Sequence, residues 1–249
     1  MIAARWAMLL IAGAGWHGIV LLAGRAEGVG LATTLALGAA LGWLSVRARH
    51  DVAPARLVAG LLLIAAAPLT GVALVEIGAV VAALLWCAMP RLRWPALALA
   101  LLALPILPTL DVLAAYPLRR VSAMLTVAML RLNGIGVGLE GVALRWHGRE
   151  LLFDGPCSGV RMLWATLVLA CVLAMVRRAR PAAFAAILAG AVGVAILGNA
   201  LRAASLFYLE EGFVALPGDA AMHEVVGLAA FALVAAAAMA LPMRRSART

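Results

Sequence analysis

Charged residues are scarce in this chain. Only 12% of the residues are charged, while 66% are hydrophobic. A soluble domain of 249 residues could not bury that much apolar surface. The apolar residues come in repeated runs separated by charged residues, a pattern typical of a helical protein that crosses a membrane several times. Helices are expected because the bilayer core leaves backbone polar groups no other partner.

Lysine is absent, so all twenty basic residues are arginine, and the net charge is +9. A charge of this size can indicate nucleic-acid binding. Here the arginines form short clusters between apolar runs, where the preference of basic loops for the cytoplasmic side accounts for them. We therefore expect the lipid bilayer as a partner and no nucleic acid.

Cysteine is also rare, with three residues that form no Cys-x-x-Cys pair and no zinc-type Cys/His spacing. Neither a disulfide framework nor a metal site is expected, and no motif indicates an organic cofactor. Cys87 and Cys171 lie inside apolar runs, where cysteine usually packs as a small hydrophobic residue. Cys157 differs, because in "FDGPCSGVR" it stands between a Gly-Pro break and the apolar run 160–176.

The apolar runs predict an all-α polytopic membrane protein with about eight transmembrane helices. The predicted spans are residues 6–23, 28–46, two short helices within 57–89 that are broken near 68–71, 95–115, 158–176, 181–209 and 223–241. This arrangement divides the chain into a five-helix membrane region 1–115, an extracytoplasmic segment 116–156 and a three-helix membrane region 157–249.

Orientation follows from the loops around the last two spans. Arginine clusters at 177–180 and 244–248 indicate the cytoplasmic side, and the acidic loop 210–219 between them then faces outward. Both termini are therefore predicted to be cytoplasmic, with segment 116–156 outside. Within that segment, residues 121–132 have helical spacing and are predicted to lie along the membrane surface.

The sequence "VALRWHGRELLF" predicts two short strands around a turn at His147–Gly148. This small extracytoplasmic hairpin leads directly to the sixth span and to Cys157.

Three polar residues on the last three spans are predicted to reach the same membrane depth. Cys157 begins the sixth span at its outer end, and His223 begins the eighth span at the same boundary. Arg202 lies about 21 residues after the start of the seventh span, which corresponds to about 30 Å along a helix and places it near the outer surface. Equal depth makes a shared site feasible.

These residue types suit acyl transfer. A cysteine thiolate is a good nucleophile, and a helix N-terminus or a cation such as Arg161 or Arg202 favours it. His223 could exchange the proton between the thiol and a leaving amine. Arg202 could also stabilise the oxyanion that forms during the transfer.

Other polar residues have simpler interpretations. Asn199 lies on the same helix face as Arg202 and could hold its guanidinium or add a donor. Ser158 is expected to cap a helix. Glu76 is a carboxylate inside an apolar run for which the sequence indicates no partner, and His17 is expected to contact a neighbouring helix.

Four short motifs resemble the exosortase/archaeosortase family in their order and placement. They are "YPLR" (116–119), "CSGVR" (157–161), "NALR" (199–202) and "HEVVGLAAF" (223–231). The resemblance implies a membrane cysteine transpeptidase, analogous to sortases on an unrelated fold, with Cys157, Arg202 and His223 as the catalytic residues. One departure is Gly155-Pro156, where many members carry an acidic and a small residue.

The same resemblance implies the partners and the location. The substrates would be membrane-anchored proteins whose C-terminus carries a short motif such as Pro-Glu-Pro, a transmembrane helix and a basic tail. Cleavage would take place at the outer face of the bacterial inner membrane, often alongside exopolysaccharide production. An acidic motif residue would meet Arg119 or Arg120, or Arg145 or Arg149 nearby.

Two functions of other classes also fit the composition. A transporter or channel could use Arg202 and His223 to bind an anion in an outer vestibule, and Cys157 would then be replaceable. A non-enzymatic scaffold for exopolysaccharide assembly would tolerate the loss of Arg202 as well.

Overall fold

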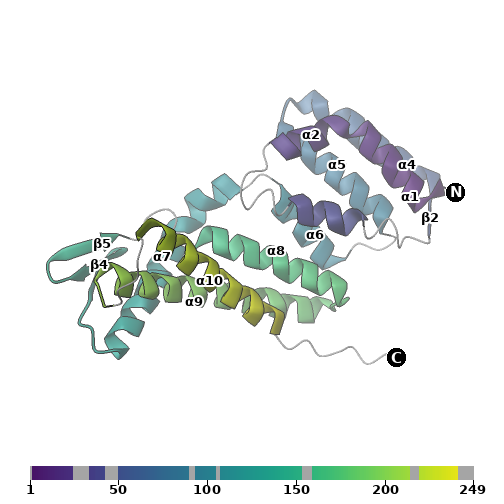
Figure 1. Ribbon diagram of the computed structural model, residues 1–249. Coiled ribbons are helices and arrows are strands. Elements are labelled where there is room, and N and C mark those ends of the chain that lie inside the picture. Colours follow the sequence, from purple (N-terminus) through teal and green to yellow (C-terminus); the bar gives the residue numbers. More distant parts are fainter. Residues whose placement is uncertain are drawn as a thin grey trace. The chain divides into compact units, whose positions relative to one another are not determined.

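The computed structural model describes residues 2–24, 34–42, 50–89, 93–104, 107–152, 159–213 and 219–240, and these are mostly helical (Figure 1). The chain divides into two compact units. Unit 1 contains Met1–Leu107 and Cys171–Phe184, and unit 2 contains Pro108–Ala170 and Ala185–Thr249.

Unit 1 is built from apolar helices around α5. Its helices include α1 (Ala4–Ala14), α2 (Trp16–Gly24), α4 (Pro54–Ala66), α5 (Ala73–Ala88) and α6 (Trp94–Ala103). The two-residue strands β1 (Ile2–Ala3) and β2 (Asp51–Val52) pair in antiparallel fashion. Most of the second predicted span, 28–46, lies outside the described residues, and residues 34–42 of it are helical.

The predicted break in the apolar run 57–89 is confirmed. Helix α4 passes into the 3₁₀ helix η1 (Ala67–Thr70), in which Pro68 occupies an early position. Gly71 follows with φ of 64°, a left-handed conformation that ends the helix at little cost for glycine. The chain then starts α5, so one long apolar run makes two helices.

The first predicted span is bent. Helices α1 and α2 meet at Gly15 with an angle of 69° between them. A Cβ atom on Gly15 or on Gly18 would lie within 3 Å of a Val80 methyl group on α5, so both glycines allow close packing. His17 makes the expected helix contact, with its Nδ1 2.8 Å from Oε2 of Glu76.

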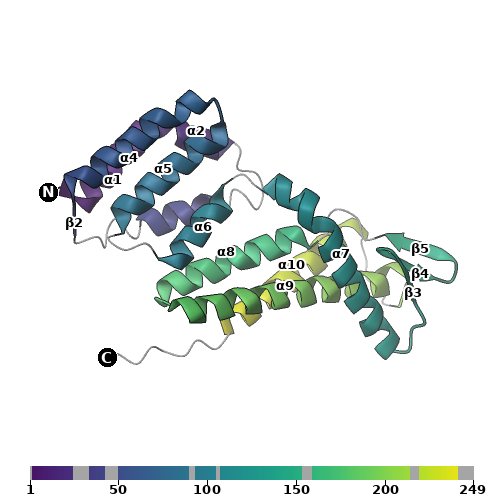
Figure 2. The same cartoon turned by 180° about the vertical axis from the view of Figure 1, so that it is seen from behind.

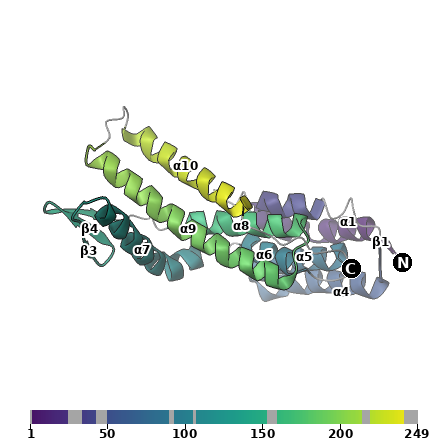
Figure 3. The same cartoon turned by 90° about the horizontal axis from the view of Figure 1, so that it is seen from below.

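Unit 2 combines long helices with a small sheet. Its elements are α7 (Leu107–Leu132), β3 (Gly138–Glu140), β4 (Ala143–Trp146), β5 (Arg149–Leu152), most of α8 (Val160–Val176) and α9 (Pro181–Glu210), and α10 (Asp219–Ala240). Helices α9 and α10 run side by side (Figure 3). The last three helices agree within a few residues with the last three predicted spans.

The structure corrects the prediction for residues 95–132. Helix α6 ends at Ala103, and α7 is one continuous helix that includes Pro117. Residues 121–132 are therefore the end of a longer helix and not a separate surface helix. The reason is packing, because the polar residues Ser122 and Thr126 are buried against α9 and do not face water.

The number of membrane crossings is not confirmed as eight. By length and composition, two helical segments among the described residues could span a bilayer, Val112–Leu132 and Pro181–Glu210. A third is possible if the bent pair of α1 and α2 counts as one span. Helices α4, α5, α6 and α8 are apolar but shorter.

The predicted hairpin is confirmed, and a third strand precedes it. Strands β4 and β5 pair from Trp146↔Arg149 to Ala143↔Leu152 in antiparallel register. The two turn residues, His147 and Gly148, have φ of 48° and 79°, as a type I′ turn requires. Strand β3 pairs with β4 on the other side (Figure 2). Strand β3 was not predicted from the sequence.

One face of the sheet covers the ends of α7 and α9. Leu144 of β4 and Val137 are buried together with Leu130 of α7 and Phe207 of α9. Trp146 meets the Phe207 ring edge-on, with 5.4 Å between the ring centroids. This core fixes the sheet to the helices that carry the candidate site.

Candidate functional site

The candidate site is built around two polar residues in the otherwise apolar helix α9. Asn199 and Arg202 are three residues apart and therefore lie on the same face. Asn199 is only 2% exposed, and the Nε atom of Arg202 is buried. Both lie in unit 2, together with every residue that contacts them below.

Asn199 belongs to a buried polar network between α7 and α9. Its Nδ2 donates a hydrogen bond of 3.0 Å to Oγ of Ser122. The hydroxyl of Thr126 donates to the carbonyl oxygens of Ser122, at 2.8 Å, and of Ala200, at 3.1 Å. Buried polar groups that are paired in this way hold two helices in one arrangement, because any shift leaves a group unsatisfied.

Ser122 and Thr126 were missed by the sequence analysis. A signal was present, since the two hydroxyl residues are four positions apart and share a helix face. The signal was not decisive, because the same spacing occurs on helices that expose such residues to water. Only the partner on α9 distinguishes the two cases.

Gly159 connects the start of α8 to this network. Its φ is +76°, in the left-handed region that favours glycine, and a Cβ atom there would lie 2.9 Å from Nδ2 of Asn199. The Gly159 carbonyl accepts the first helical bond of α8, from the amide of Leu163 at 2.9 Å. Both the backbone conformation and the space therefore require glycine two positions after Cys157.

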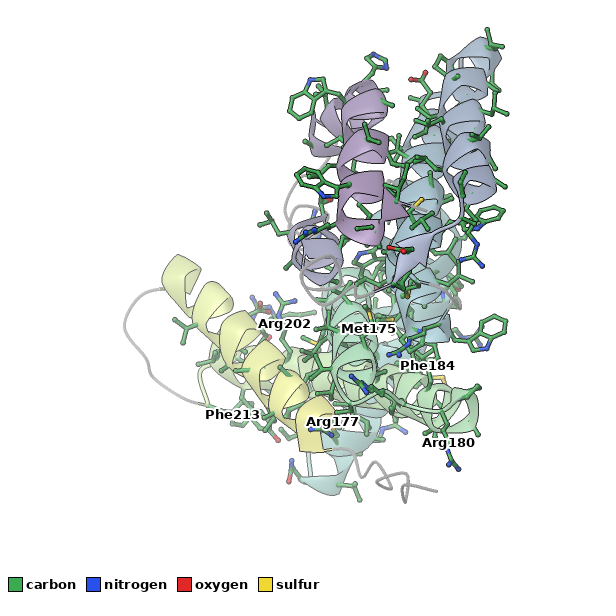
Figure 4. All side chains as sticks on the ribbon, turned by 90° about the vertical axis from the view of Figure 1, so that its right-hand side faces the viewer. Met175, Arg177, Arg180, Phe184, Arg202 and Phe213 are labelled. Carbon is green, nitrogen blue, oxygen red and sulfur yellow. The ribbon has the colours of Figure 1, made fainter. Side chains whose placement is uncertain are left out.

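Arg202 lies against α10. A Cβ atom on Gly227 would be 3.3 Å from Nε and 3.5 Å from Nη2 of Arg202, so the guanidinium packs on the helix backbone at a glycine (Figure 4). A Cβ atom on Gly198 of α9 would overlap Val234 of α10. Two glycines, one on each helix, thus let α9 and α10 approach closely.

The position of His223 is one turn before Gly227 on the same face of α10. Arg202 therefore packs on the face of α10 that carries position 223. The side chain of His223 lies outside what the structure describes, as do Cys157 and Ser158. Their predicted roles stay predictions.

The remaining predicted residues are placed as follows. Arg161 is exposed in the first turn of α8. Arg119 is half-buried on α7, and its Nε donates to the Ala115 carbonyl at 3.3 Å. Arg120 is exposed on the same helix. None of these three contacts Asn199 or Arg202 through a hydrogen bond found in the described part of the chain.

Two further arginines that were expected to meet an acidic substrate residue already have acidic neighbours. Arg145 pairs with Glu140 at 2.6 Å and with Glu150 at 2.7 Å, and these contacts, the Glu150 hydrogen bond first, raise the pKa of Arg145. Arg149 pairs with Glu211 at 3.3 Å. The charge of Arg145 is therefore partly neutralised within the sheet, and that of Arg149 by a residue just after α9.

The described residues contain no group of three or more His, Cys, Asp or Glu side chains that could hold a metal ion. What the site offers instead is a cation, a buried amide and two close glycine contacts. Gly159 touches Asn199, and Gly227 touches Arg202. The segments that begin α8 and α10 thus meet the same face of α9.

Comparison with known proteins identifies the family of the chain. Residues 30–240 match the family model of the transmembrane exosortases. Comparison with curated proteins and with solved structures gave no match. Because the matched region covers most of the 249 residues, the chain belongs to the transmembrane exosortase family.

Proposed function

We propose that this protein is a membrane cysteine transpeptidase that cleaves C-terminal sorting signals. The observation that carries the proposal is the pair of contacts on α9. Gly159 packs on Asn199, and Gly227 packs on Arg202 one turn further along. The three motif-bearing segments therefore converge on one helix face.

Chain connectivity extends this argument to Cys157. Two residues of chain span at most about 7 Å. Cys157 is two residues before Gly159, so it stays within about that distance of the glycine that packs on Asn199. Helix α8 begins one residue later, at Val160, and the backbone amides at a helix start favour an anion.

The proposed reaction has two steps. The Cys157 thiolate attacks the carbonyl carbon of the scissile peptide bond, the C–N bond breaks, and His223 gives the leaving amine its proton. An acceptor amine then attacks the resulting thioester, loses a proton to His223 and releases the thiolate. Arg202 stabilises the oxyanion of each tetrahedral intermediate.

The proposed substrates are membrane-anchored proteins with a short C-terminal motif, a transmembrane helix and a basic tail. Such a helix would dock in the bilayer and bring its motif to the outer surface. Cleavage there requires Cys157, Arg202 and His223 at the extracytoplasmic side, with both termini of the enzyme in the cytoplasm.

The test compares wild type with Cys157→Ala and Cys157→Ser in membranes. We expect a protein with a tripartite C-terminal tail to accumulate uncut in both variants. Equal processing in all three strains contradicts the proposal. A transporter or channel would tolerate Cys157→Ala, and a scaffold would tolerate Arg202→Ala also. The tail of the uncut protein, fused to a reporter domain, then serves as a quantitative probe, the tail reporter.

A further inference from the structure

Strand β5 has backbone N–H and C=O groups that point away from its partner strand β4. The order of the sheet is β3-β4-β5, so β5 forms an edge within the described part of the chain. In a two-residue hairpin the residues flanking the turn exchange both backbone hydrogen bonds, and here these are Trp146 and Arg149. Along an antiparallel pair of strands, hydrogen-bonded and non-hydrogen-bonded residue pairs alternate. Glu150 and Leu152 belong to non-hydrogen-bonded pairs, so their N–H and C=O groups point away from β4.

Strand β5 also leads to the proposed nucleophile. Cys157 follows Leu152 after five residues, which span at most about 18 Å. A peptide lying along β5 therefore has one end within about 18 Å of Cys157. The sheet itself is anchored, because Leu144 and Trp146 of β4 pack on Phe207 of α9.

We propose that β5 binds the substrate's extended motif segment by adding it to the sheet as a fourth strand. Main-chain hydrogen bonds to Glu150 and Leu152 would fix the position and direction of the substrate segment along β5. They do not depend on which side chains the segment carries. This inference rests on the proposed function and goes beyond it, because it assigns a binding surface.

The length of the edge favours a passing substrate over a permanent partner subunit. Four residues give about 13 Å of strand, and only two of them present outward groups. Two donors and two acceptors suit a peptide that must leave after each turnover. Long, flat edges are the ones that pair permanently between chains.

The experiment compares two substitutions at one position, with the tail reporter as the probe. Glu150→Pro removes the outward N–H group while leaving the β4–β5 hydrogen bonds in place. Glu150→Ala removes the same carboxylate, which pairs with Arg145, but keeps the N–H group. We expect Glu150→Pro to process the tail reporter at least about tenfold more slowly than Glu150→Ala, because only the proline variant lacks the outward N–H group. Equal rates for the two variants overturn the inference.

A second measurement guards against local misfolding. A photo-crosslinking residue replaces Glu150, or Glu140 on the opposite edge of the same sheet, in the Cys157→Ala protein. The two native side chains are similarly exposed, at 51% and 63%. We expect the uncut tail reporter to crosslink from position 150 and not from position 140. Absence of a crosslink at 150, or equal crosslinks at both positions, overturns the inference.

The outcomes also separate this inference from the proposed function. If Cys157→Ala processes the tail reporter as wild type does, the proposed function fails. If Cys157→Ala is inactive while Glu150→Pro and Glu150→Ala are equally active, the transpeptidase proposal stands and the role of β5 is wrong.

Discussion

The two units hold their helices together by different means. In unit 1 the close glycine contacts are with apolar side chains, Gly15 and Gly18 against Val80 and Gly60 against Ile11, and the polar His17–Glu76 pair involves a largely exposed His17. In unit 2 a buried hydrogen-bond network joins α7 to α9. Apolar packing tolerates small adjustments, whereas a buried polar network specifies one arrangement. Unit 1 is therefore suited to a supporting role. Unit 2 is suited to a functional site, because its network holds side chains in fixed positions.

The largest effect should come from Gly159→Ala in unit 2. The new Cβ atom would meet the Asn199 amide at 2.9 Å, and alanine disfavours the φ of +76° by about 1–2 kcal/mol. We expect processing of the tail reporter to fall by about a hundredfold while the protein still accumulates in membranes. Gly193→Ala on α9 is the control, because nothing lies within 4 Å of its Cβ position. Equal activity of the two variants would show that the contact is dispensable.

Ser122→Ala should have the next largest effect. It removes the acceptor of the Asn199 amide in a buried place, which costs about 1–3 kcal/mol. We expect Ser122→Ala to process the tail reporter roughly tenfold more slowly than wild type. Asn199→Leu breaks the same hydrogen bond, so its loss of activity should include the same contribution. The measurement is a double-mutant cycle, in which Ser122→Ala combined with Asn199→Leu costs less than the sum of the single changes. Strict additivity would mean that the two residues act independently.

Gly18→Ala tests the apolar packing of unit 1. In unit 1 the added methyl group meets Val80 at 2.9 Å and the Glu76 carbonyl oxygen at 3.1 Å, an overpacking that costs about 1–3 kcal/mol. We expect a lower melting temperature in detergent but nearly wild-type processing per folded molecule. Gly24→Ala is the control, because its Cβ position is open. A loss of activity without a loss of stability would assign unit 1 a direct part in the reaction.

The smallest effect is expected at the surface of unit 2. Reversing the charge of exposed Arg120 should slow the processing of a tail with an acidic motif a few-fold more than that of a neutral one, since exposed charges interact weakly. The measurement compares two tail reporters that differ at one motif residue, and Arg119→Glu provides the parallel case. Equal losses on both reporters would remove Arg119 and Arg120 from substrate recognition.

Local patterns predicted α8, α9, α10 and the β4–β5 hairpin to within a few residues, but not α7, whose end was predicted as a separate surface helix. The apolar runs before and after Arg177 and Arg178 are long and uninterrupted, so α8 and α9 could be placed from sequence alone. The turn at His147–Gly148 was predicted from strand-like residues on either side. The place of Arg202 along α9 followed from counting residues after Pro181, whereas its membrane depth stays a prediction.

What the sequence could not supply were contacts between elements. The burial of Ser122 depends on Asn199, 77 positions away. Gly227 is an ordinary helical glycine until Arg202 is placed beside it. Strand β3 is three residues long and lacks an alternating pattern, so its pairing with β4 supplies the only signal. In each case a tertiary partner decides the outcome.

The length of α9 makes bilayer thickness a variable of this protein. Thirty residues of helix extend about 45 Å, whereas the hydrocarbon core is about 30 Å thick. The excess requires the helix to tilt or to project into the headgroup region. Asn199 and Arg202 lie in its second half, and the aromatic residues Phe207 and Tyr208 follow them. Because α9 is long and apolar enough to span a bilayer, a thicker membrane would set the candidate site deeper and a thinner one would raise it toward water, which makes lipid acyl length a variable for the proposed reaction.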